Sequence, residues 1–338
     1  MNNIFVSICI PNYKRPKELQ RLLNTVDSLL YDEIEIIVCD DRSPNIDEVR
    51  IVTDEFSKNT KYGFKFVENN ENYGYDRNLR ELINNASGDW IVFMGNDDEF
   101  VDGALDMLIN FLKNNRSLGY VMKSHYFIHK NNKKEIFRYY KGDKFFEAGE
   151  QAYLSLFRKS VFISGFTIKR DYITNILTNE FDGTLLFQLY LLAKVCLKFP
   201  SAYFDYPLTQ QYDEGTPEFG NAENEKSLYT PGSVTIENSL RFLGGFFKIT
   251  NYIDKEYGLS STKKIIRDMS KYFYPSLALQ RNKGLKEFFR YVRELNIIGF
   301  NITIYYYIYV IALVIFGKNI CDNAIRLIKN LMRKTPEL

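Results

Sequence analysis

Apolar runs alternate with segments of helical spacing along roughly the first 115 residues of the chain. The runs at 4–10, 34–39 and 90–94 are mostly apolar, and a short strand is predicted at 64–67. Such runs suit strands that are buried on both faces. Between the first two runs, the leucines and the valine of segment 19–30 fall on one side of a helix. Further helices are predicted at 46–58, from Asp76 onward and at 103–112. This alternation predicts a mostly parallel sheet with helices on both faces.

The pattern changes after this segment. Two strand-like stretches, 120–128 and 135–140, are joined by a polar turn and predict an appended hairpin. An apolar run at 161–168 has Ser164 and Gly165 at its centre. A glycine inside a strand indicates either close approach of a ligand or a bulge, and both interpretations stay open.

The remaining chain predicts three regions. Residues 210–233 form the longest polar stretch with glycine and proline, which is typical of a functional lid or of disorder. From residue 236 onward the pattern is helical throughout. We therefore expect an α/β domain at 1–209, a lid or flexible loop at 210–235, and a helical region at 236–338.

Composition excludes several classes of protein. Lys and Arg number 44 against 42 Asp and Glu, and this small excess does not favour nucleic acid as a partner. The 4 cysteines are scattered, which fits reduced thiols better than zinc or disulfides, and the 2 histidines exclude a multi-histidine metal site. No Gly-x-Gly-x-x-Gly follows the first strand, so an NAD-linked oxidoreductase is disfavoured. We expect a cytoplasmic protein without a signal peptide.

Acidic residues follow two of the predicted strands directly. Asp40 and Asp41 end the second run, and Asp97, Asp98 and Glu99 come after the fourth. The carboxyl ends of parallel strands share one edge of a sheet, where ligands of α/β proteins bind. Adjacent carboxylates repel each other, and a divalent cation with oxygen ligands would offset that repulsion. The alternative is a solvated loop in which Asp98 begins the next helix.

Four motifs along this segment carry a family resemblance. They are VSICIPNY at 6–13, CDDRS at 39–43, NYG at 72–74 with Arg77 and Asn78, and Gly88-Asp89 with Asn96-Asp97-Asp98. Together they resemble the family 2 glycosyltransferases of the GT-A fold, over about residues 4–110, and especially bacterial surface-polysaccharide enzymes of the abequosyltransferase-like group. The resemblance implies inverting transfer of a sugar from a nucleotide-sugar donor to a glycan hydroxyl, with Mn²⁺ or Mg²⁺ as cofactor.

The resemblance also implies roles for individual residues. Tyr13 stacks on the nucleobase, Asp41 hydrogen-bonds it, and Asp97 contacts the ribose. Asp98 binds the metal that bridges the two phosphates. Tyr13 could instead be a surface aromatic residue, and Arg15 and Arg77 could be ordinary helix residues. The complete set implied to bind the donor is Pro11, Tyr13, Arg15, Asp40, Asp41, Asp76, Arg77, Asn96 and Asp97.

Two departures from the family pattern affect the predicted chemistry. Gly95-Asn96 stands where the family has an acid and a serine before the pair. The Glu-Asp pair that usually supplies the general base is absent. We predict Asp182 as the base, with Glu180 second, although Asp182 could equally cap a helix. This departure keeps an alternative open, a catalytically inactive GT-A domain that acts as a scaffold subunit.

The carboxyl-terminal region contains an apolar run of about 15 residues at 302–316. At about 1.5 Å per residue it extends about 22 Å, short of the ~30 Å of a bilayer core. Basic residues follow it, which favours peripheral attachment to the inner face of the cell membrane. The alternative is a core helix with a basic tail. The family resemblance implies an acceptor on a polyprenyl diphosphate lipid. The basic residues are Lys318, Arg326, Lys329, Arg333 and Lys334.

Overall fold

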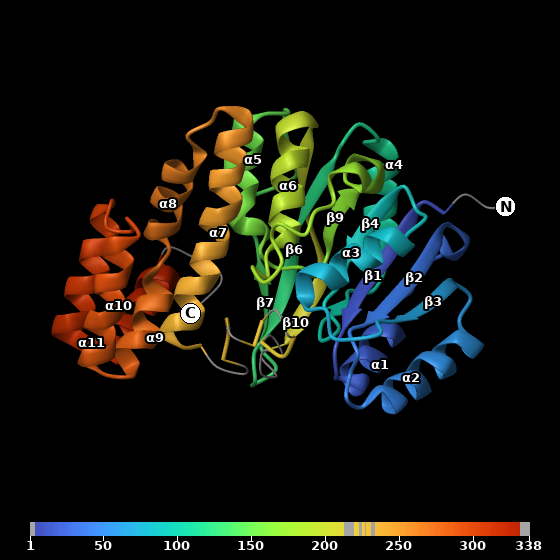
Figure 1. The fold of residues 1–338 in the computed structure, drawn as a ribbon, viewed down its shortest axis with the longest axis horizontal. Helices are drawn as coiled ribbons and strands as arrows, with labels where there is room; N and C mark the ends of the chain where they lie inside the picture. Colours follow the sequence, from blue (N-terminus) through green and yellow to red (C-terminus); the bar gives the residue numbers. More distant parts are fainter. Residues whose placement is uncertain (1–3, 213–219, 223–224, 227, 231–233, 332–338) are drawn as a thin grey trace. The chain divides into compact units, whose positions relative to one another are not determined.

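The computed structural model divides the chain into two compact units, residues 1–232 and 233–338 (Figure 1). The first unit contains one large sheet with helices around it, and the second is helical. This architecture confirms the predicted α/β domain followed by a helical region. The residues that the structure describes are 4–212, 220–222, 225–226, 228–230 and 234–331, with side chains to 328.

The first four long strands of the sheet are parallel and lie in the order β3-β2-β1-β4. Their apolar side chains are almost completely buried in β1, β2 and β4, as expected for central parallel strands. Because these strands run in one direction, their carboxyl ends meet at one edge of the sheet. The bounds are β1 Val6–Asn12, β2 Ile34–Asp40, β3 Gly63–Glu68 and β4 Trp90–Phe93.

The other half of the sheet is mixed. Strand β9 (Phe166–Lys169) is antiparallel to β4 and β6, whereas β10 (Ser201–Tyr212) is parallel to β6 (Tyr120–Ile128). The expected hairpin is present, because β7 (Lys134–Phe137) pairs with β6 in antiparallel fashion. The short strands β5 Glu99–Phe100 and β8 Lys144–Phe146 pair with β10.

Helices cover this sheet through their apolar faces. Leucines of α1 and α4 pack with one side of β1, β2 and β4 in a single core cluster, while α3 contacts β1 and β2. The α-helices of this unit are α1 Pro16–Asn24, α2 Ile46–Asn59, α3 Tyr75–Asn85, α4 Ala104–Asn114, α5 Glu150–Leu156 and α6 Phe187–Lys198. Short 3₁₀ turns lie at Tyr31–Glu33, Phe157–Ser160, Arg170–Tyr172 and Thr174–Ile176.

Helix α1 is shorter than the sequence pattern indicates. Its apolar face was expected to continue to Leu29 and Leu30, but the helix ends at Asn24 and Leu29 is 85% exposed. Thr25 closes the last turn, because its hydroxyl and its backbone N–H both donate to the carbonyl of Leu22. The leucines beyond it therefore belong to the connection to β2.

The second unit consists of five helices within the described residues, as the sequence pattern predicts. Their bounds are α7 Ile236–Tyr257, α8 Ser261–Lys271, α9 Tyr274–Asn282, α10 Leu285–Ile297 and α11 Ile304–Leu331. Of the expected lid at 210–235, residues 210–212 are the end of β10, and much of the rest lies outside the described residues.

Helix α11 corrects the length estimate made from residues 302–316. The helix continues past the apolar run, and its segment Ile304–Ile328 is long and apolar enough to cross a membrane by length and composition. The backbone of Gly317 is not helical, with φ at 71°, so the helix is divided into two shorter pieces. Only 17% of its most apolar window is buried, which does not fit a core helix.

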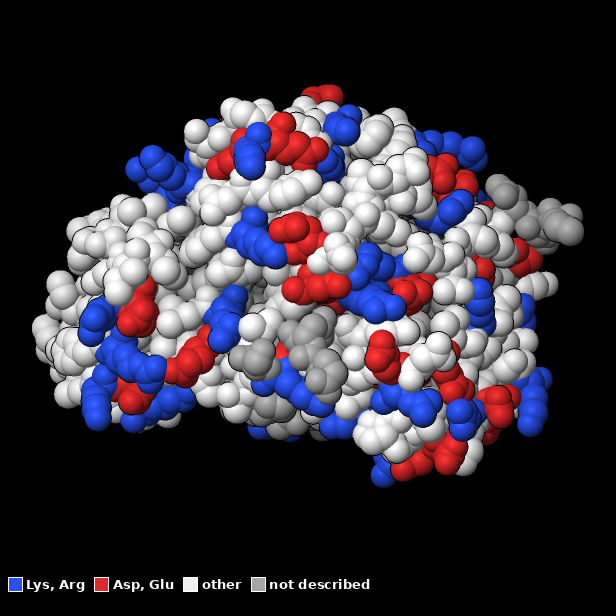
Figure 2. All heavy atoms as spheres, in the orientation of Figure 1, with Lys and Arg blue, Asp and Glu red and all other residues white. Residues whose placement is uncertain are grey.

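Charged side chains are mixed on the face shown in Figure 2, where basic and acidic groups lie next to one another in small clusters. This distribution agrees with the formal net charge of +2. It gives no basic stripe on that face of the kind that follows a nucleic acid backbone.

Candidate active site

Asp40, at the carboxyl end of β2, organises the loop that follows the strand. Its carboxylate accepts hydrogen bonds from Asn12 Nδ2 at 2.7 Å, from the backbone N–H of Ser43 at 2.7 Å and from the Ser43 hydroxyl at 2.6 Å. Asn12 stands at the end of β1, and its own Oδ1 accepts from Asn96 Nδ2 at 2.7 Å. A chain of buried hydrogen bonds thus joins the ends of β2 and β1 to the turn after β4. A role of Asn96 in donor binding stays a prediction.

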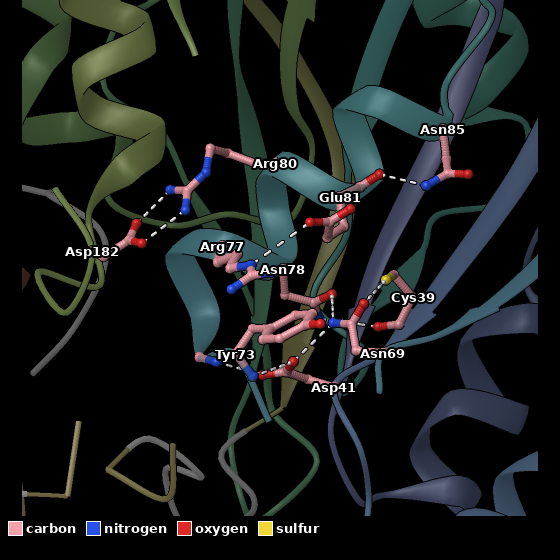
Figure 3. A network of polar contacts seen from close by, with 11 residues as sticks. Cys39, Asp41, Asn69, Tyr73, Arg77, Asn78, Arg80, Glu81, Asn85 and Asp182 are labelled. Carbon is pink, nitrogen blue, oxygen red and sulfur yellow. Dashed lines mark hydrogen bonds and ion pairs between the residues drawn. The ribbon is translucent and has the colours of Figure 1, made fainter. Parts of the chain in front are cut away.

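Asp41 holds the loop that precedes α3 (Figure 3). Asn69 Nδ2 and the backbone N–H groups of Tyr73 and Gly74 donate to its two carboxylate oxygens at 2.7–2.8 Å. Burial raises the pKa of Asp41 to about 6, although these three hydrogen bonds act in the opposite direction. The predicted base-binding acid is thus positioned at the sheet edge, with its oxygens directed at the NYG segment.

The turn between β1 and α1 has a strained backbone. Lys14 and Arg15 both have left-handed φ angles, 59° and 52°, which cost about 1–2 kcal/mol each for residues with a side chain. The Ser43 hydroxyl stabilises this turn by accepting from the N–H of Lys14 at 2.6 Å. Tyr13 is half-buried there, with the Lys14 ammonium 5.1 Å from its ring centre. Pro11 is the penultimate residue of β1. Strain of this kind often marks a functional site.

Asp97 and Asp98 point into different surroundings. The side chain of Asp97 is 41% exposed and forms an ion pair with Arg15. Asp98 is only 4% exposed, and its Oδ2 accepts a hydrogen bond from the Ser164 hydroxyl. Burial, and then the charge of Asp97, raise the pKa of Asp98 to about 7. A buried acid beside a second acid is an arrangement typical of functional sites.

Lys123 of β6 is a site residue that the sequence pattern does not identify. It is 6% exposed, and its charge interacts with that of Asp98. Burial lowers the pKa of Lys123 to about 7, against the opposing effect of the Asp98 carboxylate. Gly165 is needed beside it, because a Cβ there would lie 2.5 Å from Lys123 Cε. The glycine in the 161–168 run therefore accommodates this lysine side chain.

Arg77 and Asp76, on the first turn of α3, differ in accessibility. The guanidinium carbon of Arg77 lies 3.4 Å from the centre of the Tyr73 ring, and Arg77 Nε lies 3.8 Å from Glu81 Oε1 (Figure 3). Asp76 is 1% exposed, and its two oxygens accept from the backbone N–H groups of Leu185 and Phe187 at 2.9 Å. Asp76 thus fixes the start of α6 against α3. A direct contact of Asp76 with the donor stays a prediction.

Asp182 forms a two-point ion pair with Arg80 of α3 (Figure 3). Arg80 Nη2 lies 2.8 Å from Asp182 Oδ2, and Nη1 donates to Oδ1. The hydrogen bonds from Leu185 and Phe187 to Asp76 hold the same segment, 180–187, against α3. Glu180 is exposed two residues earlier. Asp182 is therefore held in place by Arg80, which lies on the same helix as Asp76.

The carboxylate oxygens of Asp97 and Asp98 are ligands that suit a divalent cation. Mg²⁺ and Mn²⁺ commonly bind one or two carboxylates together with phosphate oxygens. Among the described residues no group of three or more His, Cys, Asp or Glu side chains could hold a metal ion. The arrangement thus suits a cation whose remaining ligands come from a bound diphosphate, with Asp98 as the protein ligand. Basic side chains already pair with two acids of this turn, so the repulsion between the acids does not by itself require a cation.

An α/β sheet whose polar groups gather at the carboxyl ends of β1, β2 and β4 is the class of fold that binds nucleotides at that edge. Residues 7–171 match the family model described as Glycosyl transferase family 2. This segment is a family 2 glycosyltransferase domain, which confirms the resemblance carried by the four motifs.

Curated relatives match about a third of the chain. Abequosyltransferase RfbV of Salmonella typhimurium is 28% identical over 109 residues, 32% of this chain and 33% of the relative. The Escherichia coli protein "UDP-Glc:alpha-D-GlcNAc-diphosphoundecaprenol beta-1,3-glucosyltransferase WfgD" is 32% identical over 121 residues, 36% of this chain and 46% of the relative. The match therefore spans a third to less than half of these relatives.

A solved structure shares the fold over most of the chain. It is that of S. aureus TarS 1-349 in complex with UDP-GlcNAc, with a TM-score of 0.60 and 15% sequence identity. The similarity covers 86% of this chain and 79% of that one. At this identity the comparison confirms the GT-A fold and nothing finer.

The buried Asp76 predicts a specific pH dependence of stability. Burial raises its pKa from 3.8 to about 7, so the folded protein holds a proton that the unfolded chain has released in this interval. The stabilisation is complete below pH 3.8 and is lost as the pH rises through about 7. We expect Asp76→Asn to reduce the slope of unfolding free energy against pH by up to about 1.4 kcal/mol per unit.

Urea unfolding at intervals from pH 4.5 to pH 8 measures this slope. Asp54→Asn, an exposed acid on α2, is the matched control and should keep the slope of the wild type. Asp41 and Asp98, whose pKa values are also raised, leave a residual slope of the same sign. An unchanged slope in Asp76→Asn would show that this carboxyl does not titrate as its burial implies.

Proposed function

We propose that the protein transfers one sugar, with inversion, from a nucleotide-sugar donor to a hydroxyl of a glycan acceptor in bacterial surface polysaccharide assembly. The observation that carries this proposal is the turn with Asp97 and Asp98 at the carboxyl edge of the family 2 domain. The named glycosyltransferases among the relatives support it. An inactive scaffold is less favoured, because both acids are present and held by specific contacts.

The donor site that we propose follows the edge from β2 to β4. Tyr13 and Asp41 would take the base, Arg15 the diphosphate, and Asp97 the ribose. A Mn²⁺ or Mg²⁺ ion held by Asp98 would supply positive charge to the leaving diphosphate. The strained turn at Lys14 and Arg15 supports this arrangement, because Arg15 reaches Asp97 from it at the same edge.

Donor binding is tested by thermal shift with UDP-, GDP-, CDP- and dTDP-sugars, each with and without Mn²⁺. A ligand that binds only the folded state raises the melting temperature by mass action. We expect one nucleotide class to raise the melting temperature of the wild type in the presence of metal. Asp98→Asn should abolish the shift, and Asp54→Asn should keep it. A shift that survives in Asp98→Asn would remove Asp98 from the metal site.

Asp182 is our proposed general base for the acceptor hydroxyl, with Glu180 as second candidate. The ion pair with Arg80 fixes the orientation of the Asp182 carboxylate, and positioned bases contribute about 10²–10⁴-fold to rate. We expect Asp182→Asn to lose transfer by about that factor while donor binding stays intact. Rates of nucleoside diphosphate release with acceptor present measure this, and Glu180→Gln is the companion variant.

The outcome of that assay also separates the two functional hypotheses. Release of nucleoside diphosphate by the wild type, but not by Asp182→Asn, supports the enzyme with its proposed base. Wild-type rates in Asp182→Asn would move the base to Glu180 or elsewhere. Donor binding without release in any variant would support the scaffold hypothesis.

The acceptor that we propose is carried on a polyprenyl diphosphate lipid at the inner face of the cell membrane. One of the relatives, WfgD of Escherichia coli, is named as a glucosyltransferase for an undecaprenol-linked substrate. Exposed apolar side chains on α11, broken at Gly317, suit a helix pair that lies in the membrane surface. The exposed set includes Ile304, Tyr305, Tyr307, Ile308, Ile311, Ile315, Phe316, Ile320, Leu327 and Ile328.

Membrane attachment predicts co-sedimentation with vesicles that contain phosphatidylglycerol. The double variant Ile308→Asp/Ile311→Asp places charge among the exposed side chains, so we expect at least about tenfold weaker binding. Ile51→Asp, on the exposed face of α2, is the control and should bind as the wild type does. Equal sedimentation of the double variant, or none for the wild type, would contradict the role of α11.

A further inference from the structure

The two pieces of α11, before and after Gly317, both contact the start of the same short helix, α9. The ring centre of Tyr274 in α9 lies 5.7 Å from that of Tyr309 in the first piece. The Tyr274 hydroxyl donates to Asp322 Oδ1 in the second piece at 2.6 Å. On a straight helix, Tyr309 and Asp322 would be about 20 Å apart, which is farther than one tyrosine side chain bridges. The two pieces therefore bend toward α9 at Gly317.

One glycine and one arginine build this bend. Gly317 has φ 71° and ψ 176°, a backbone conformation that is essentially restricted to glycine. Carbonyl groups in the last turn of a helix lack partners within that helix. Leu313 lies in the last turn of the first piece, and Arg281 Nε of α9 donates to its carbonyl oxygen at 2.9 Å. Arg281 therefore stabilises the helix end that the bend creates.

Exposed isoleucines form a strip along the first piece of α11. Their spacings of four, three and four residues place them on one face of the helix, and their exposed fractions are 52–68%. The opposite face carries Tyr306 and Leu313, which are buried. An interfacial helix lies with such an apolar face in the lipid. The members of this isoleucine strip are Ile304, Ile308, Ile311 and Ile315.

The second piece carries charges where a spanning helix requires apolar residues. Lys318 and Asp322 form an ion pair there, within the segment that is long enough to cross a membrane. Charged side chains are rare in spanning helices, because they are costly at the bilayer centre. Arg326 is exposed beyond this pair and suits the anionic surface of the inner leaflet. Each piece alone is about 20 Å long, short of the ~30 Å of a bilayer core.

We propose that α11 is a bent anchor that inserts into one leaflet of an anionic bilayer and does not cross it. Arg281 and Tyr274 of α9 are the positioning residues that hold the bend, through Leu313 and Asp322. Both ends of α11 then stay on the same face of the membrane. The inference rests on the membrane attachment in the proposed function, and it adds the depth of insertion and the residues that determine it.

Electron paramagnetic resonance measures the distance between two spin labels on α11 while the protein is bound to vesicles that contain phosphatidylglycerol. The labels are attached through Ile304→Cys and Leu327→Cys, because both positions are exposed. The 4 native cysteines are buried, and the protein without these substitutions is the labelling blank. On a straight helix the two positions lie about 35 Å apart. We expect a distance at least about 5 Å shorter, and about 35 Å on vesicles would overturn the proposal.

The variant Arg281→Met keeps the length of the side chain and removes the donor to the Leu313 carbonyl. We expect the label distance to lengthen toward that of a straight helix. Arg281→Lys, which keeps a cationic donor, should restore the short distance. Arg293→Met is the matched control, since Arg293 is an exposed arginine of α10, and it should leave the distance unchanged.

Gly317→Ala tests the same bend through the backbone and replaces Arg281→Met should that variant not fold. An added Cβ would meet no atom closer than Arg281 Nη2 at 3.8 Å, so the substitution acts through the positive φ alone. We expect it to lengthen the label distance as well. Unchanged distances in both Arg281→Met and Gly317→Ala would overturn the role of these residues in the bend.

Sedimentation with the vesicles separates a failure of this inference from a failure of the proposed membrane attachment. If the wild type does not sediment, the attachment itself is wrong, and a dimer in solution would then show that a second copy covers the isoleucine strip. If the wild type sediments and its labels lie about 35 Å apart, the attachment stands and only the bent anchor is wrong.

Discussion

The compensation of three neighbouring carboxylates at the end of a buried strand is the constraint on which the site depends. Asp97, Asp98 and Glu99 follow β4 with almost no access to solvent for the last two. Burying them requires opposite charge at short range. Arg15 and Arg21 supply it to Asp97 and Glu99. The Ser164 hydroxyl, which precedes β9, donates to Asp98 and ties the parallel half of the sheet to its mixed half.

A second group of buried acids fixes the loops around the same edge. Asp40 and Asp41 bind backbone and side-chain donors of the loops after β2 and β3, and Asp76 binds the backbone that starts α6. Each carboxylate accepts the backbone hydrogen bonds that water would accept in the unfolded loop. These loops therefore form a rigid rim around the sheet edge. Helix α3 supports both the loop that Asp41 binds and the segment that carries Asp182.

The parallel half of the fold and its acids could be predicted from local patterns, because buried parallel strands are continuous apolar runs and their ends share an edge. Arg21 and Arg80 could not, since each reaches its acid across about 80–100 residues of chain through the topology of the sheet. The position of Lys123 near this site likewise depends on the strand order, because β6 is not a neighbour of β4 in the sheet. For the same reason the sequence alone suggested that a metal must neutralise the acids at 97–99, whereas Arg15 and Arg21 pair with two of them. The end of α1 and the continuation of α11 past Gly317 depend on single capping and backbone features that periodicity does not describe.

The central claim is that the edge formed by β1, β2 and β4 binds a sugar nucleotide whose diphosphate shares a divalent cation with Asp98. Anomalous scattering from Mn²⁺, in a crystal grown with the donor that the protein binds, tests it most directly. The account predicts one manganese peak about 2.0–2.2 Å from an Asp98 oxygen, with phosphate oxygens completing its coordination. A donor bound elsewhere, or a manganese ion without contact to Asp98 in the presence of bound donor, would contradict it.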